Sequence, residues 1–127
     1  MQDKVTYEYA IIRLMPKVER GEFLNVGVIL FSKPLDYLEL KYQLDEERIK
    51  AFSQDLDLEM VRDYLEAWKR IAEANENSGP IGQQASASRF RWLTASKSTI
   101  IQCSEVHPGL CIDPKKVLEK IFEDYVV

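Results

Sequence analysis

The side chains best suited to chemistry gather in one segment, residues 89–104, which is rich in arginine, hydroxyl and amide groups. Its candidate ligand-binding members are Arg91, Thr94, Ser98, Thr99 and Gln102. Guanidinium groups and hydroxyls near a turn can bind phosphate or carboxylate. The segment therefore predicts an anion site. The plainer interpretation is that these side chains cap turns and pair with the surplus of Asp and Glu.

A second cluster of polar residues opens the most apolar run of the chain. Its members are Glu19, Arg20, Glu22 and Asn25. Asn25 and Gly27 alternate along this run, so we expect them on one face of a strand. A glycine inside a strand indicates the close approach of another backbone or of a ligand. The structural alternative is that Asn25 satisfies nearby backbone groups and Gly27 makes room for a tryptophan.

His107 is the only histidine and is a candidate general base. Cys103 lies four positions earlier, which makes a thiol–imidazole pair one alternative. A lone histidine beside Pro108 and Gly109 is more often a turn residue, and a buried thiol is inert. Neither residue therefore defines a catalytic site.

Composition bounds the classes of function. A chain of 127 residues is long enough for one domain with a core, and 46% hydrophobic with 30% charged residues is typical of a folded globule. The net charge of −4 argues against nucleic-acid binding, which depends on basic surface. No apolar run approaches the roughly 18 residues of a membrane span, and no signal peptide is recognisable, so we expect a cytoplasmic protein and no membrane partner.

Cofactor motifs are also missing from the sequence. One histidine and two cysteines do not supply the four ligands of a structural zinc site. The glycines of the chain lack the spacing and the lysine of a phosphate-binding loop. The sequence therefore predicts no metal and no cofactor.

Alternating apolar side chains predict the strands that must position these clusters. Strands are expected over 5–14, 22–31 and 37–43, and their short links favour an antiparallel meander. From Val26 on, neither face of the second strand is polar, which predicts a strand covered on both faces. A fourth strand is expected over 98–104, followed by a turn.

The same sequence motif predicts three helices. In each, an aspartate N-cap lies between two apolar residues that form a hydrophobic staple. These helices cover about 45–54, 58–74 and 114–125. Residues 75–88 predict a long loop, and 89–93 a short helix or strand. All three helices look like packing elements, because their apolar residues follow helical spacing.

Two parts of the sequence resemble a known family. Residues 7–16 and 19–31 resemble the opening of an uncharacterised bacterial family, domain of unknown function 3037. Residues 92–104 and 106–109 resemble its second signature, in which Lys97 stands where arginine is more usual. The resemblance implies no activity, because none is established for the family. It does imply a protein partner, since members are often encoded beside a protein similar to a HipA-like serine/threonine kinase.

The two signatures coincide with the two polar clusters. If the sheet brings the second strand beside the fourth, ten side chains can share one pocket. These are Glu19, Arg20, Glu22, Asn25, Arg91, Thr94, Ser98, Thr99, Gln102 and His107.

The predicted fold class is α+β, a single domain over 1–127 with an antiparallel sheet of about four strands and helices packed mainly on one face. The favoured function is a non-enzymatic binding or regulatory domain with a protein partner. The alternative is a small enzyme or sensor that binds a phosphate-bearing ligand through the Arg/Thr/Ser/Gln cluster. A third interpretation gives the polar residues a purely structural role.

Overall fold

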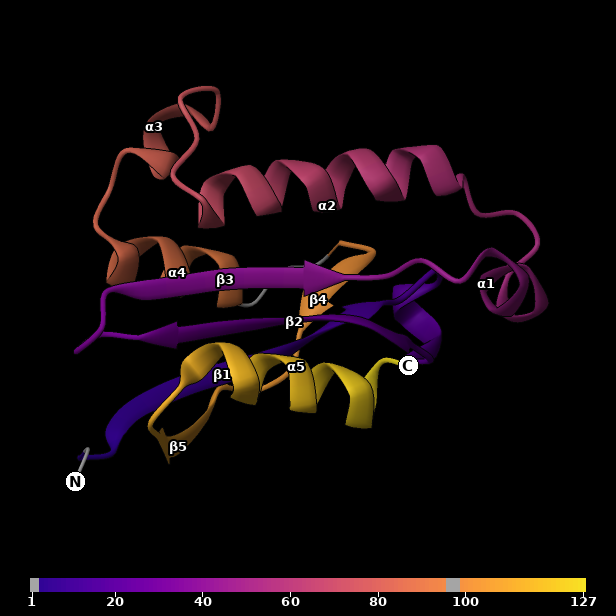
Figure 1. Ribbon diagram of the computed structural model, residues 1–127. Helices are drawn as coiled ribbons and strands as arrows, with labels where there is room; N and C mark the ends of the chain where they lie inside the picture. Colours follow the sequence, from indigo (N-terminus) through magenta and orange to yellow (C-terminus); the bar gives the residue numbers. More distant parts are fainter. Residues whose placement is uncertain (1–2, 96–98) are drawn as a thin grey trace.

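Within the described part of the chain, five strands form one antiparallel sheet that carries helices on both faces (Figure 1). The computed structural model describes residues 3–95 and 99–127. The strands are β1 (Val5–Leu14), β2 (Leu24–Ser32), β3 (Tyr37–Tyr42), β4 (Ile101–Cys103) and β5 (His107–Cys111). Their order is β3-β2-β1-β4, and β5 pairs with β1 along the same edge as β4. The predicted α+β class and the antiparallel meander of the first three strands are confirmed.

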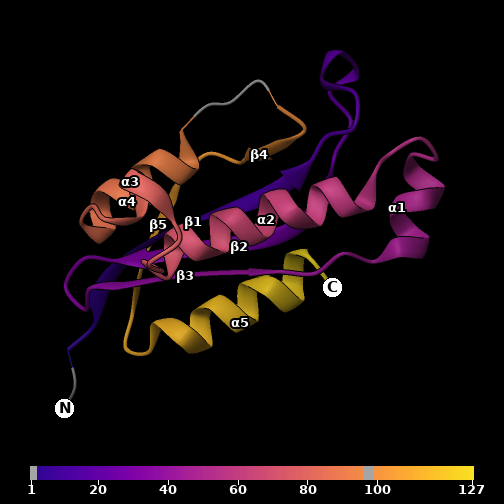
Figure 2. The ribbon, with the colours of Figure 1, turned by 90° about the horizontal axis from the view of Figure 1, so that it is seen from above.

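Most of the helices lie on one side of the sheet. They are α1 (Glu46–Phe52), α2 (Leu58–Ala72), α3 (Gly79–Gly82), α4 (Ser86–Thr94) and α5 (Pro114–Tyr125), and a short 3-10 turn, η1 (Val18–Arg20), joins β1 to β2. Figure 1 shows α2 above the sheet and α5 beneath it, and in Figure 2, which is seen from above, α2 lies in front of the strands. Within the described residues, no helix has both the length and the apolar character that crossing a membrane requires.

The predicted aspartate caps are present. The side chains of Asp45, Asp57 and Asp113 each accept a hydrogen bond of 3.0 to 3.2 Å from a backbone N–H of the first helical turn. These bonds satisfy donors that have no partner within the helix. The three caps explain why α1, α2 and α5 begin where the sequence predicts.

The sheet separates two hydrophobic cores. The α2-side core contains Ile12 and Ile29 with side chains from α2 and α4, and the α5-side core contains Ile11 and Val28 with side chains from α5. Every residue of β2 from Val26 to Ser32 is buried. The prediction of a strand covered on both faces is therefore confirmed.

Two segments differ from the prediction. The expected loop over 75–88 contains α3 and the start of α4, and the expected turn after β4 includes β5. Pro108 has no N–H to donate, but an edge strand tolerates it. Gly109 lies under the ring of Tyr7, where a Cβ atom would come within 2.4 Å of the ring. The His-Pro-Gly sequence is therefore a strand shaped by its partner rather than a turn.

A β-bulge in β2 changes which residues share a face. Ile12 pairs with Gly27 and Arg13 pairs with Asn25, so Val26 is the extra residue. The expectation that Asn25 and Gly27 lie on one face is wrong, because the bulge breaks the alternation between them. Gly27 faces the α2-side core, where a Cβ would meet the carbonyl oxygen of Lys41 at 2.7 Å.

We expect Gly27→Ala to lower the free energy of unfolding by about 1 to 3 kcal/mol, because the added methyl group must displace backbone. Chemical denaturation would measure the loss. Gly79→Ala is the comparison, since a Cβ atom there would have no neighbour within 4 Å and only the positive φ opposes the change. Equal losses for the two variants would show that close packing at Gly27 has no special effect.

Candidate functional site

The structure does not unite the predicted polar residues in one pocket, because they lie on both faces of the sheet. Arg91 on α4 forms two hydrogen bonds, of 3.0 and 3.2 Å, with the carboxylate of Glu8 on the α2 side of the sheet. Asn25 and His107 lie on the α5 side. Moreover, β1 lies between β2 and β4, so the second strand and the fourth are not neighbours. The candidate side chains that the structure describes therefore do not share one pocket.

Three described members of the 89–104 segment are bonded to nearby backbone. Thr94, Thr99 and Gln102 each donate a hydrogen bond of 2.7 to 2.8 Å to a main-chain carbonyl within four residues. Arg89 caps the end of α2 through bonds to the carbonyls of residues 71 and 72. Ser98 lies outside the described residues. The phosphate site stays a prediction, and its described members have structural partners.

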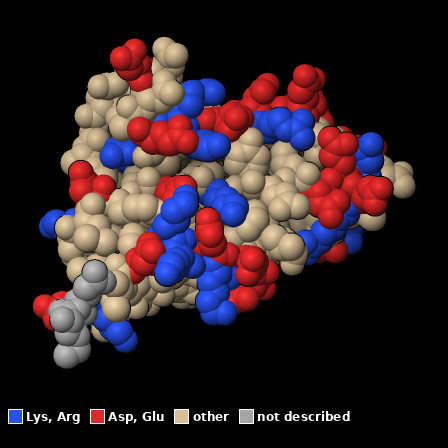
Figure 3. Space-filling view, in the orientation of Figure 1, with Lys and Arg blue, Asp and Glu red and all other residues tan. Residues whose placement is uncertain are grey.

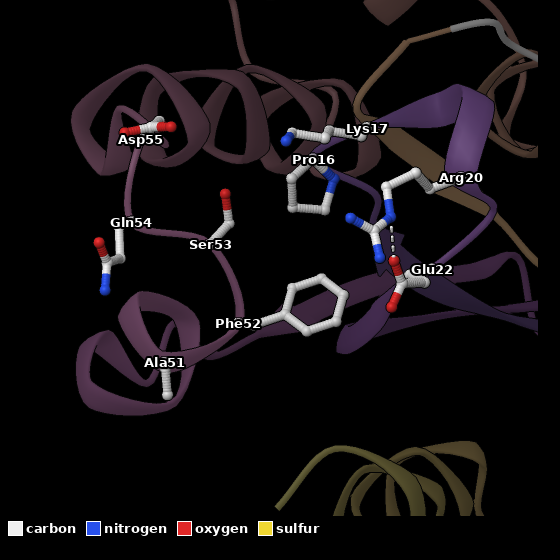
Figure 4. Close-up of a pocket in the computed structure, with 9 residues that line it drawn as sticks. All are labelled: Pro16, Lys17, Arg20, Glu22, Ala51, Phe52, Ser53, Gln54 and Asp55. Atoms are coloured by element: carbon white, nitrogen blue, oxygen red, sulfur yellow. Dashed lines mark ion pairs between the residues drawn. The ribbon is translucent and has the colours of Figure 1, made fainter.

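The cluster at the start of β2 borders a shallow hollow of about 380 Å³ between η1 and the link from α1 to α2 (Figure 4). Arg20 and Glu22 pair with each other at 2.5 Å on one side of it, and both are largely exposed. Lys17 and Asp55 add one charge of each sign to the lining. Glu19 lies on η1 and is exposed. Because the two positive and two negative side chains that line the hollow balance, the hollow has little preference for an ion of either sign.

Asn25 has a structural task at the end of α5. Its amide nitrogen donates a 3.1 Å hydrogen bond to the carbonyl of Tyr125, and Arg48 donates one of 3.4 Å to the carbonyl of Val126. The last carbonyls of a helix lack partners within the helix, so both bonds act as caps. Asn25 therefore fixes the end of α5 against the sheet.

The thiol–imidazole alternative is excluded by the sheet. His107 is exposed on the α5 side, and its ring centre lies 5.3 Å from that of Tyr9. Cys103 packs against the α2-side core, where its sulfur lies 3.5 Å from the carbonyl of Leu93. The two side chains point to opposite faces and cannot exchange a proton directly.

One residue that sequence reasoning passed over, Arg13, stands out on the α5 side. Ile12 and Leu14 point into the α2-side core, so Arg13 between them points the other way. Its backbone pairs with Asn25 on one edge of β1 and with Gln102 on the other, which places those two residues about 10 Å apart. The sequence feature that could have identified Arg13 is its position as the only charged residue in the otherwise apolar segment 10–14.

Among the residues that the structure describes, the guanidinium of Arg13 has no anionic partner. It lies over the ring of Phe23, with 4.2 Å between its Cζ and the ring centre. Its Nε is the only buried side-chain nitrogen or oxygen without a hydrogen bond in the part of the chain that the structure describes. Across residues 3–95 and 99–127, Arg13 also forms no ion pair.

Arg13 belongs to a partly exposed surface that we call the β1 face. It consists of Tyr9, Arg13, Phe23, Gln102, His107 and Tyr125. Helix α5 packs mainly against β2 and β3, so this surface beside it stays open. Phe23 and Tyr125 are 38% and 52% exposed, and Tyr9, Arg13 and Gln102 are half-buried. The β1 face thus combines aromatic rings with one guanidinium.

Within the described residues, no group of three or more His, Cys, Asp or Glu side chains is placed to hold a metal ion. On the β1 face, rings supply apolar contact, and Arg13 supplies positive charge and hydrogen-bond donors.

The family model "Protein of unknown function (DUF3037)" matches residues 9–126. The chain belongs to this family. No curated protein and no solved structure gives a significant match. The DUF3037 match includes every residue of the β1 face and all of both signature segments except residues 7 and 8, but the family carries no assigned activity.

We expect Asn25→Ala to destabilise the DUF3037 chain by about 1 kcal/mol, through loss of the bond to the Tyr125 carbonyl. Asn25→Asp should cost more at pH 7, because a carboxylate would face the negative end of α5. Below pH 4 the protonated acid can donate again, so the Asp variant should recover stability relative to the Ala variant. Thermal melts at both pH values test this, and a constant gap between the variants would contradict the capping role.

Burial and the neighbouring phenols of Tyr125 and Tyr7 raise the pKa of Tyr9 above its usual value of 10.0. In the unfolded chain Tyr9 ionises near pH 10, whereas the folded chain keeps its proton to higher pH. The associated stability is thus present below pH 10 and lost as pH rises through the raised pKa. Tyr9→Phe should lose less stability than wild type between pH 8 and 11, measured by denaturation. An identical loss in both proteins would refute this account.

Proposed function

We propose that this DUF3037 chain is a non-enzymatic binding domain that contacts a protein partner through the β1 face. One observation carries the proposal: three aromatic rings and one arginine share a sheet surface that α5 leaves open. Tyr and Arg are enriched among the residues that dominate binding energy at protein interfaces, and Phe is enriched in such interfaces generally. The composition of the β1 face therefore suits a protein contact.

The partner we propose is the HipA-like kinase that the family resemblance implies. Nucleic acid is a weaker candidate, since the chain carries a net charge of −4. Figure 3 supports this ranking, because Lys and Arg side chains alternate with Asp and Glu on the face it displays and form no continuous basic stripe among the described residues. The proposal includes a cytoplasmic location.

The enzyme or sensor alternative has less support. Its anion cluster depends on Arg91, Thr94, Thr99 and Gln102, and each of these already bonds to a neighbour within the fold. A phosphate-bearing ligand would compete with those bonds, whereas a partner on the β1 face would not.

Affinity capture from the native host with tagged protein tests the proposal. We expect wild type to recover the kinase-like protein, and Phe23→Ala and Tyr125→Ala to recover at least tenfold less. Met60→Ala is the matched control, because Met60 is a similarly exposed apolar residue on α2, on the other side of the sheet. Melting temperatures confirm that each variant folds.

Two results would count against the proposal. Wild-type protein could recover no partner above an untagged control. Alternatively, Met60→Ala could reduce recovery as much as the two β1-face variants do, which would place the contact elsewhere.

A further inference from the structure

We infer that Arg13 is a carboxylate-binding site, filled by an Asp or Glu side chain of the protein that docks on the β1 face. The inference rests on the proposed function and adds the chemistry of the partner. It starts from the one charged side chain of the β1 face whose charge nothing in the described chain balances.

The environment of the Arg13 guanidinium is energetically unfavourable in the protein alone. Its Nε is withdrawn from water without a hydrogen bond, and the nearest compensation is the ring of Phe23 at 4.2 Å. A partly desolvated cation without a counter-ion loses hydration that a ring recovers only in part. An anion would offset this loss, so the free structure has an unmet preference for negative charge.

The terminal nitrogens of Arg13 provide the contact. Among the described side chains, Nε is the only buried polar atom without a partner, and neither terminal nitrogen forms a hydrogen bond. Both terminal nitrogens must therefore reach solvent. Together they present the planar fork that binds the two oxygens of a carboxylate.

Arg13 is the sole Lys or Arg side chain of the β1 face. One N–H of the Asn25 amide is used by the Tyr125 carbonyl, and one N–H of the Gln102 amide by the Thr99 carbonyl. A phosphate site ordinarily combines several donors, such as lysines or the backbone N–H groups of a helix start. One guanidinium without such support matches one carboxylate better.

The end of α5 favours the same choice. Its C-terminal carbonyls at residues 125 and 126 adjoin the β1 face and carry partial negative charge. This charge opposes a doubly charged phosphate about twice as strongly as a singly charged carboxylate. The exposed rings of Phe23 and Tyr125 flank the approach and exclude water, which strengthens an ion pair formed between them.

NMR of the ¹⁵N-labelled full chain tests the inference with hexaglutamate as the probe. The Nε–H signal of Arg13 should be visible because the group is buried, and its loss in Arg13→Lys identifies it. We expect a saturable shift of this signal, accompanied by the backbone signals of Phe23 and Tyr125. Arg91, an exposed arginine already paired with Glu8, is the internal control and should not saturate.

Arg13→Lys keeps the positive charge but lacks the fork, so it should bind hexaglutamate at least tenfold more weakly. Arg13→Gln should abolish binding. The amide spectrum of each variant shows whether the fold is intact, and hexalysine at the same ionic strength should cause no shift.

Three outcomes would overturn the inference. The first is an unmoved Arg13 signal at millimolar hexaglutamate. The second is a shift of Arg91 equal to that of Arg13, which would indicate unspecific attraction. The third is saturation by inorganic phosphate at lower concentration than hexaglutamate, which would assign the site to phosphate.

Experiments can distinguish a wrong carboxylate assignment for Arg13 from a wrong proposal of a protein contact. If the captured partner binds Arg13→Lys as well as wild type while Phe23→Ala loses it, the protein contact stands and the carboxylate assignment falls. If no partner is captured at all, the hexaglutamate titration still decides whether Arg13 binds carboxylate.

Discussion

The architecture depends on the backbone of β1 being hydrogen-bonded along both edges. One edge is filled by β2 and the other is shared between β4 and β5. Ser104 closes the break between the two short strands: its N–H donates to the carbonyl of Ile11, and its hydroxyl accepts from the N–H of Ile11, each at 2.8 Å. Since Ser104 is buried, losing either bond would leave a polar backbone group unsatisfied in the core.

The same strand determines what the protein displays. Its residues alternate between the two cores until Arg13, where the apolar pattern ends on the α5 side. The bulge in β2 turns Asn25 toward α5, so the residue that pairs with Arg13 also holds the helix end in place. The residues that surround Arg13 thus have structural roles, but the positive charge of Arg13 has none that the described structure shows.

Local physics made much of the fold predictable. The aspartate caps indicated α1, α2 and α5, and continuous apolar character indicated a doubly covered β2. Strand β5 was not predicted, because the sequence His-Pro-Gly is typical of a turn. Only pairing with Tyr7 and its neighbours makes this segment extended. The β1 face was not predicted, for a related reason. Composition revealed polar clusters such as Arg91 and Thr94, but whether a side chain is already bonded depends on which strands become neighbours.

The shared strand also sets the order in which the chain can fold. Ile11 and Ser104, which bond to each other, are 93 positions apart. The hairpin of β1 and β2 can form early, but its second edge has no partner until residues 101–111 arrive. Contacts of such separation slow folding, and an open apolar edge invites association with other chains. During synthesis this edge therefore stays unpaired until residues 101–111 have been made.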